Sequence, residues 1–262
     1  MADRPADYFR LRQICLVAPK LKPVVDDIAA ILELEVCWRD PAVAKYGLEN
    51  ALFPLGTKFL EVVAPTRRNT AAGRFLDRSG GHGGYMVIFD CGDIERRRRR
   101  AEELGIRIAN VIEYPDYLGV QLHPRDTGAA MIEFNHTPGG EDIFGPYHPA
   151  GPDWSKAVRT SQTKALVEIE LESTEPQKLA AQWAKIIEAP VSRTPEGNPR
   201  IVLQGAAIRV VGVPVGRPDC LGALRVAVAD VARAKAAAAA RGCKVEGDAI
   251  HLGGVHFRLQ PA

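Results

Sequence analysis

The feature that most constrains the fold is a pattern of elements that occurs four times along the 262-residue chain. Each unit of about 50 residues starts with a short apolar run, continues with apolar residues at helical spacing and ends with further short apolar runs. The units begin near residues 12, 85, 165 and 224. This order predicts an α+β fold of tandem β-α-β-β-β modules and does not fit a parallel sheet with helices on both faces.

The boundaries of the elements follow from spacing and from turn residues. Leu21, Val24, Val25 and Ile28 recur at three- and four-residue intervals, which predicts a helix after the first strand. Helices are expected over 21–32, 93–104, 175–188 and from 231 to the stop at Gly242. Strands are expected over 12–18, 36–39, 48–53, 58–63, 85–91, 106–112, 117–122, 131–135, 165–171, 201–203, 207–211, 224–228, 243–246, 249–252 and 255–259.

A proline- and glycine-rich segment separates the second unit from the third. Residues 139–162 contain Gly145-Pro146 and His148-Pro149, and such residues exclude a regular element. Apolar residues within the segment indicate that it lies on the protein: Ile143, Phe144, Tyr147 and Trp154. We therefore expect two domains of paired modules, 10–138 and 163–262, joined by a linker over 139–162.

Charge and cysteine content exclude several classes of function. The net charge is +2, so a basic surface for nucleic acid is not expected, and the run Arg96–Arg100 is interpreted as a solvated helix face. The five cysteines form no Cys-x-x-Cys pair, which is typical of reduced thiols in a cytoplasmic protein. No apolar run reaches the ~18 to 20 residues of a membrane span, and the N-terminus lacks the apolar core of a signal peptide.

A charged residue lies in the middle of one predicted strand. After a turn over 124–128, Ile132 and Phe134 share one face of the strand, whereas Met131 and Glu133 share the other. The carboxylate of Glu133 is either solvated on an open sheet or held by a partner in a concave site, because an unpaired buried charge is costly.

Three segments carry a resemblance to a known family. A module that runs from Leu11-Arg12-Gln13-Ile14 to Leu60-Glu61-Val62, a second module that ends in Met131-Ile132-Glu133-Phe134, and the Leu122-His123-Pro124 turn resemble the vicinal oxygen chelate superfamily. That superfamily includes glyoxalase I, methylmalonyl-CoA epimerase, extradiol dioxygenases and antibiotic-resistance proteins. The resemblance implies two cupped mixed sheets backed by helices, with a divalent metal in the cup.

The metal positions of the superfamily correspond to Gln13, Glu61, Met86 and Glu133 in this chain. The resemblance therefore implies Gln13, Glu61 and Glu133 as ligands of Mg²⁺, Mn²⁺ or Zn²⁺, but the thioether of Met86 is a poor ligand for such ions. Glu61 and Glu133 are the predicted catalytic residues; exposed strand residues are the alternative. Met86 is a predicted substrate contact.

Three further residues are predicted to contact substrate. Asn50 either faces substrate or faces solvent, and His82 is either a metal ligand or a loop and substrate-contact residue. His123 either lines the cup or is a half-exposed residue before a turn.

The corresponding positions of the second half are Ala165, Arg209, Ala223 and Arg258. They offer no ligand set, so the second half is expected to be a scaffold, interface or lid, with Arg209 and Arg258 as candidate anion contacts. The predicted function is a lyase or isomerase that acts on a small molecule with adjacent oxygen atoms. Alternatives are a sequestering, resistance-type binding protein and, less favoured, a dioxygenase. No nucleotide cofactor is expected, and a homodimer is an open alternative for the assembly.

Overall fold

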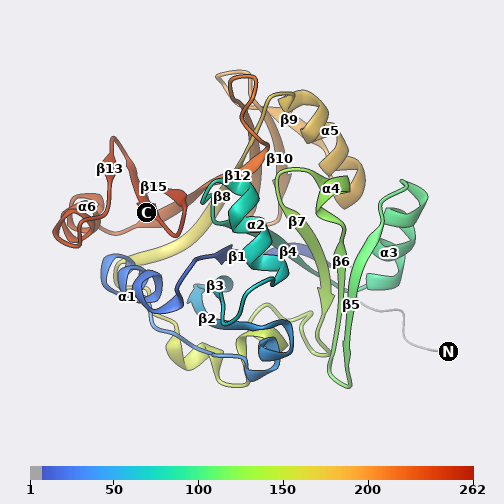
Figure 1. Cartoon of the computed structure of the whole chain (residues 1–262), viewed down its shortest axis with the longest axis horizontal. Coiled ribbons are helices and arrows are strands. Elements are labelled where there is room, and N and C mark those ends of the chain that lie inside the picture. The colour runs from blue at the N-terminus through green and yellow to red at the C-terminus, as the bar shows by residue number, and fades with distance from the viewer. Residues whose placement is uncertain (1–7) are drawn as a thin grey trace.

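The structure is a computed structural model that describes residues 8–262. Within these residues the first half forms one mixed seven-stranded sheet, ordered β2-β3-β1-β4-β7-β6-β5 (Figure 1). β1 is parallel to β3, β4 is parallel to β7, and the two modules meet where β1 runs antiparallel to β4. The strands are β1 (Phe9–Val17), β2 (Leu48–Leu55), β3 (Lys58–Pro65), β4 (Gly84–Cys91), β5 (Ile108–Tyr114), β6 (Tyr117–Leu122) and β7 (Met131–His136).

The second half repeats this arrangement. Over the described chain its eight strands are ordered β13-β14-β15-β12-β8-β11-β10-β9, with β8 parallel to β11, β12 parallel to β15, and β8 antiparallel to β12. The strands are β8 (Thr163–Ser173), β9 (Val191–Arg193), β10 (Pro199–Leu203), β11 (Ala206–Gly212), β12 (Cys220–Val228), β13 (Val245–Glu246), β14 (Ala249–Leu252) and β15 (Val255–Pro261). The predicted α+β class and the paired modules are confirmed.

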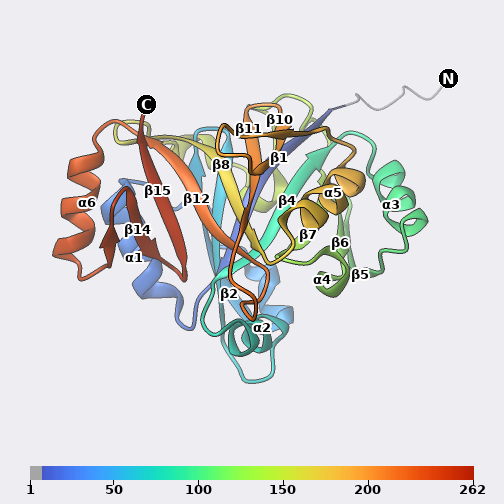
Figure 2. The ribbon, with the colours of Figure 1, turned by 90° about the horizontal axis from the view of Figure 1, so that it is seen from above.

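Helices flank the two sheets in pairs. α1 (Leu21–Leu32) contacts α6 (Val231–Ala240), and α3 (Ile94–Glu103) contacts α5 (Pro176–Ile187). Figure 2 shows the first pair on one side of the strands and the second pair on the other. The apolar strand faces of both halves belong to one buried cluster, which includes Ile14, Phe134, Ile169 and Leu224. Since the two halves share this core, their independence as domains stays a prediction.

The glycine-rich stretch 80–84 permits close contact between the halves. A Cβ atom on Gly83 would lie 1.7 Å from the carbonyl oxygen of Gly253, and one on Gly84 would lie 2.2 Å from that of Leu221. The amide of Gly83 also donates to the carbonyl of Gly254 at 3.2 Å. These glycines are therefore required where β4 meets the second half, because any side chain would force the two backbones apart.

Local expectations had mixed outcomes. The strand expected over 36–39 is wrong; Trp38 makes only an isolated bridge to Leu52. The turn expected over 124–128 is present between the antiparallel strands β6 and β7, as one helical turn, α4 (Pro124–Thr127), followed by Gly128 at φ 66°. Helix α2 (Ala71–Ser79) was not predicted, since few of its residues are apolar and buried. It begins where the Thr70 side chain accepts from the amide of Gly73.

The arginine run on α3 is only partly solvated. Arg98 pairs with Glu102 along the helix at 3.3 Å, as expected for an exposed face. Arg97 is instead buried and donates to the carbonyl of Ile187 and to Glu188 at the end of α5. The interpretation as a wholly solvated face is therefore wrong for Arg97, because that residue faces the neighbouring helix of the second half.

The linker lies on the first sheet, as its apolar residues indicated. Tyr147 and Trp154 are buried against Phe59, with ring centroids 4.8 and 5.1 Å away. The buried guanidinium of Arg12 lies near all three rings and donates to the backbone carbonyls of Thr57 and Ile143. Phe144 is an exception, since 72% of its surface is exposed. No helix in the described part of the chain is both long and apolar enough to cross a membrane.

Candidate functional site

The concave face of the first sheet encloses a cavity of about 360 Å³. Strand alternation explains its wall, because Ile14, Leu60, Ile132 and Phe134 point into the core and their neighbours point the other way. Five residues proposed from the sequence line this one cavity: Gln13, Asn50, Glu61, Met86 and Glu133. Their convergence is a structural fact, whereas their chemical roles stay predictions.

Glu61 is held by two neutral amides. Its Oε1 accepts from Asn50 Nδ2 at 2.7 Å, and its Oε2 accepts from Gln13 Nε2 at 2.9 Å. The residue is 8% exposed, and no cation forms an ion pair with it among the described residues. Burial therefore raises the pKa of Glu61 above its usual value, and the hydrogen bonds offset only part of that shift.

Glu133 occupies the matching position in the second module. Its Oε1 accepts from Tyr117 Oη and its Oε2 from Gln121 Nε2, both at 2.7 Å. It is 3% exposed. Burial is again the main cause that raises the pKa of Glu133, and the negative charge of Glu61 adds to it. Each carboxyl group can therefore hold a proton closer to neutral pH than an exposed glutamate can.

A continuous chain of hydrogen bonds joins the two glutamates. Starting from Glu61, Gln13 accepts through Oε1 from Tyr147 Oη at 3.0 Å, and Tyr147 Oη accepts from Asn135 Nδ2 at 3.1 Å. Asn135 Nδ2 also donates to Tyr117 Oη at 3.4 Å, and that hydroxyl donates to Glu133. All intermediate members are neutral, so the chain fixes the carboxyl groups without neutralising them.

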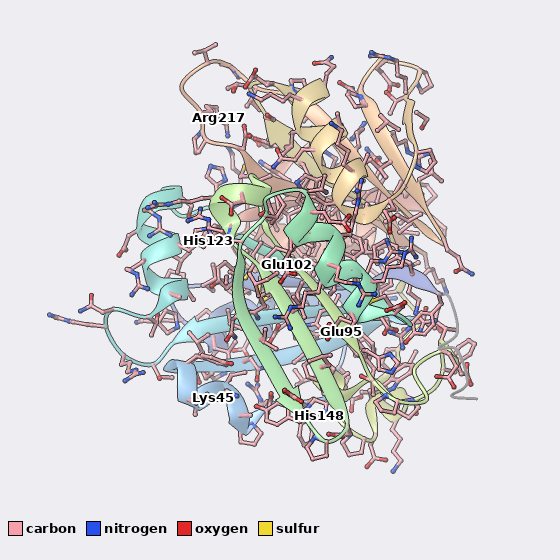
Figure 3. All side chains as sticks on the ribbon, turned by 90° about the vertical axis from the view of Figure 1, so that its right-hand side faces the viewer. Lys45, Glu95, Glu102, His123, His148 and Arg217 are labelled. Carbon is pink, nitrogen blue, oxygen red and sulfur yellow. The ribbon has the colours of Figure 1, made fainter. Side chains whose placement is uncertain are left out.

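Aromatic rings close one edge of the cavity. His148 stacks on Tyr114 and Tyr117, with centroids 5.4 and 4.9 Å away, and its Nδ1 lies 3.1 Å from Asp116 Oδ2. Lys45 donates to the hydroxyl of Tyr114 at 2.6 Å. Figure 3 shows Lys45 and His148 near the same end of the β5–β6 hairpin. The linker thus supplies part of the wall of the cavity.

The charge of the wall is one-sided. Among residues 8–262, those that line the cavity include three acidic side chains, from Asp40, Glu61 and Glu133, and no lysine or arginine. Most of the remaining wall is apolar, with Leu48, Val63, Ile88 and Met131 among its members. Such a cavity favours a neutral, largely apolar group and disfavours an anion.

The residues present do not fit the divalent metal that the superfamily resemblance implies. The amide oxygen of Gln13 is engaged by Tyr147, and each carboxylate oxygen of the two glutamates already accepts from a neutral donor. Met86 supplies a thioether at the fourth position. No group of three or more His, Cys, Asp or Glu residues in the described chain could hold a metal. A two-histidine, one-carboxylate iron site fits no better, since His148 is the only histidine lining the cavity within residues 8–262.

The two other predicted histidines lie outside this cavity. His82 and His123 line an adjoining groove, and the Nδ1 of His123 accepts from the amide of Arg125 at 3.2 Å. They therefore do not border the cavity that holds the glutamates. Any contact with substrate would have to occur in the groove.

Sequence reasoning missed four residues of the site. Tyr117 and Gln121 share one face of β6, and Gln121 lies directly opposite Glu133 in the β6–β7 pairing. That register could have been inferred once the two strands were paired. Tyr147 and His148 carried no such signal, because they come from an irregular segment without periodicity.

The second cup has a different content. β8 pairs with β12 so that Glu168 lies opposite Arg225, as Gln13 on β1 lies opposite Ile88 on β4. The position equivalent to Gln13 is therefore Glu168, and the assignment to Ala165 was wrong, because the strand contains register shifts that the sequence does not reveal. Arg209 and Ala223 lie opposite Glu170, as Glu61 and Met86 lie opposite Cys15.

The arginines of the second cup bind carboxylates of the same sheet. Arg209 and Arg258 both donate to Glu170, and Arg200 donates to Glu168 at 2.7 Å. Arg225 lies 3.5 Å from Glu168. Arg209 and Arg258 are thus engaged within the chain, and no bound anion is needed to explain their placement.

Comparison with known proteins agrees with this geometry. A family model described as a glyoxalase-like domain matches residues 14–187, more than half of the chain. The chain belongs to the glyoxalase-like family of the vicinal oxygen chelate superfamily. A comparison with curated proteins finds no sequence match.

Two solved structures share the fold of this glyoxalase-like protein, and a third aligns with part of the chain. A hypothetical protein from Staphylococcus aureus is 11% identical with a TM-score of 0.69, covering 97% of this chain and 100% of its own. A variant of 4-hydroxymandelate synthase from Streptomyces coelicolor is 13% identical with a TM-score of 0.65, covering 92% of this chain and 76% of its own. A methylmalonyl-CoA epimerase variant from Streptomyces coelicolor is 20% identical, with a TM-score of 0.44 over 49% of this chain and 96% of its own.

Proposed function

We propose that this protein is a lyase or isomerase that moves a proton on a small molecule with adjacent oxygen atoms, using Glu61 and Glu133 as an acid–base pair. The observation that carries the proposal is the placement of both carboxyl groups in one apolar cavity, where burial raises both pKa values and no cation of the described chain pairs with either group. Raised pKa values in a cavity are typical of groups that exchange protons during a reaction.

The two glutamates lie on opposite sides of the cavity. β3 carries Glu61 and β7 carries Glu133, with β1 and β4 between them in the sheet. Three strand spacings amount to roughly 14 Å along the sheet, and its curvature directs both side chains towards the same space. A small substrate would thus have one carboxyl group on each side, an arrangement suited to removing a proton at one atom and supplying one at another.

The proposed reaction has two proton transfers. Ionised Glu133 removes the proton from a carbon next to a carbonyl group, and the electron pair of the C–H bond forms the C=C bond of an enol. Protonated Glu61 donates its proton to the carbonyl oxygen as that oxygen gains the electron pair of the C=O bond. Glu61 then takes back a hydroxyl proton of the enol as a carbonyl group forms again. If Glu133 returns its proton to carbon, the product is an isomer; if the electron pair instead expels a leaving group that Glu133 protonates, the product is that of a lyase.

The surroundings of the two glutamates favour one ionised and one protonated carboxyl group. The negative charge of one glutamate disfavours ionisation of the other, so the pair holds one proton over a range of pH. The apolar wall of Val63, Ile88 and Met131 excludes water and strengthens each electrostatic interaction inside. Tyr117 and Gln121 restrict the position of the Glu133 carboxyl group, which matters because proton transfer requires contact at about 3 Å.

Hydrogen exchange tests the proposal before the natural substrate is known. The protein is incubated in D₂O with a panel of α-hydroxycarbonyl and 1,2-dicarbonyl compounds, and replacement of C–H by C–D is followed by NMR. Exchange should require the protein and disappear in the double variant Glu61→Gln/Glu133→Gln. Glu49→Gln is the matched control, because Glu49 is exposed on β2 and lies outside the cavity.

Two results would contradict the proposal. Unchanged exchange in the double variant would move the chemistry out of this cavity. A compound that binds in the cavity without any exchange would instead favour the sequestering, resistance-type function, since binding alone needs no proton transfer.

A further inference from the structure

A second hollow continues from the cavity towards the surface. It has a volume of about 870 Å³ and lies between α2, the α4 turn and the loop before β12. It shares Ala71, Tyr85, Ala109 and Met131 with the cavity that holds the glutamates. Figure 3 shows His123 where α2 and α4 approach each other, below the Arg217 loop of the second half. We call this hollow the basic groove.

The basic groove has a charge opposite to that of the cavity. Arg74 and Arg78 on α2, together with Arg125 on α4, line it, and all three are exposed. None of them forms an ion pair with a carboxylate of residues 8–262. The only acidic residue that lines the groove, within those residues, is Asp219. The excess of positive charge is therefore not neutralised by the protein itself.

The two histidines add hydrogen-bonding capacity. Nδ1 of His123 accepts the amide hydrogen of Arg125, so the neutral ring carries its proton on Nε2, and that nitrogen is a donor. His82 also lines the groove, in the middle of the glycine-rich stretch that follows α2. The groove thus combines arginine forks and imidazole donors from two walls, a combination that favours an oxyanion.

We propose that the basic groove binds an oxyanion, a phosphate or a carboxylate, at one end of the molecule whose uncharged reacting end enters the cavity. The inference rests on the proposed function for the reacting end, but not for the anion site itself. The acidic, apolar cavity repels an anion, whereas the groove attracts one. The charge difference therefore orients an elongated substrate with its anion outward and its reacting group beside Glu61 and Glu133.

The proposal also gives the second half a role. Pro218, Asp219 and Cys220 form part of the groove wall, although they follow the last strand of the third module. The groove wall therefore includes residues from both halves of the chain. The second half then shapes the outer part of the binding site, while the reacting residues come from the first half.

Direct binding of small anions tests the groove without any activity assay. Calorimetric titration with inorganic phosphate, butyl phosphate and pentanoate should give saturable binding to the wild-type protein. The variants Arg74→Gln/Arg78→Gln and Arg125→Gln should each weaken binding about 10-fold or more, because each removes charge-assisted hydrogen bonds from one wall. The matched control is Arg68→Gln/Arg193→Gln, which lowers the net charge as much as the double variant does but changes exposed arginines outside both hollows.

The outcomes separate the possibilities. Tighter binding of butyl phosphate than of pentanoate identifies a phosphate ester, and the reverse identifies a carboxylate. Absence of saturable binding to wild type, or equal loss in the groove and control variants, would overturn the proposal. If anion binding depends on the groove but no compound undergoes exchange in the cavity, the anion site stands and the proposed function fails. If exchange depends on the glutamates but no anion binds, the proposed function stands and the anion site fails.

Discussion

The two cups of this protein share a strand order and differ in how they hold buried glutamates. In the first cup, the donors to Glu61 and Glu133 within residues 8–262 are all neutral, and both side chains face an open cavity. In the second cup, Glu168 and Glu170 are paired with arginines. The same backbone therefore supports either a reactive pair of carboxyl groups or a closed ionic network.

The difference arises at equivalent strand positions. Arg209 occupies the place of Glu61 in the strand register, and Arg258 occupies the place of Glu133. Long guanidinium side chains fill the space above the sheet and satisfy the carboxylates, so no free base remains. Replacing arginine by glutamate at these two positions removes the pairing and leaves two acids beside apolar residues, at a cost in desolvation. The desolvation cost of the carboxyl groups in the first cup is therefore offset less by favourable charge interactions than that of the arginine-paired carboxylates in the second cup.

The largest expected effect is on catalysis. Once a substrate is known, Glu133→Gln should lower turnover by about 10²-fold or more, because the amide keeps the shape but cannot remove a proton. Glu170→Gln, in the second cup, should leave turnover per folded molecule within about twofold, since Glu170 does not line the cavity. Steady-state kinetics on both variants measures the contrast. Equal losses in the two variants would remove the functional distinction between the cups.

For the free energy of unfolding, the change in the second cup should have the larger effect. Glu170→Gln leaves Arg209 and Arg258 without a carboxylate that both now contact, so the free energy of unfolding should fall by about 2 kcal/mol. Chemical denaturation at neutral pH gives this value. Glu61→Gln is the matched change in the first cup, and it should cost less than Glu170→Gln, because within residues 8–262 no cation pairs with Glu61 and none loses its partner. A loss of similar size in both variants would contradict the comparison.

The metal content of the first cup gives a sharper test. No stoichiometric binding of Mg²⁺, Mn²⁺ or Zn²⁺ is expected in the wild-type protein, because the donor set does not fit. Met86→His adds an imidazole beside Gln13, Glu61 and Glu133, and should bind Zn²⁺ at least about 10-fold more tightly. Calorimetry measures both proteins. Stoichiometric metal in the wild type that is lost in Glu133→Ala would restore the predicted ligands Gln13, Glu61 and Glu133.

The parts of the site that the sequence predicted are those governed by strand alternation. Glu61 and Glu133 lie on the concave face, as expected, because successive side chains of a strand point to opposite faces. Tyr147 and His148 could not be predicted, since their positions depend on the packing of an irregular segment against Phe59 and Arg12. The interaction is nonlocal and has no periodic signal.

Register and tertiary context explain the remaining errors. Ala165 was proposed where Glu168 lies, because bulges in the β8–β12 pairing shift the strand. Helix α2 was missed because its apolar stripe is short: Ala72, Phe75 and Leu76 form it, and only Ala72 is fully buried. Its position over the cavity and the basic groove nevertheless makes it part of the site.

The smallest expected effect, a dependence of stability on pH, distinguishes the glutamates of the first cup. Burial raises the folded-state pKa of both Glu61 and Glu133 above the usual value of 4.5. Between that value and the raised one, the folded protein binds more protons than the unfolded chain, so the free energy of unfolding falls as pH increases. The stabilising contribution of proton binding is fully present below pH 4.5 and is lost as pH rises through the folded-state pKa.

The difference between variant and wild type isolates this contribution from other titrating groups. The free energy of unfolding of Glu61→Gln/Glu133→Gln, minus that of wild type, should be constant below about pH 4.5 and should increase as pH rises towards neutrality. Any constant offset reflects the altered hydrogen bonds and cancels from the slope. Urea denaturation across this pH range supplies the measurement. A difference that is flat, or that decreases with pH, would mean that the two carboxyl groups ionise as readily in the folded protein as in the unfolded chain, and the basis for treating them as a proton-transfer pair would be lost.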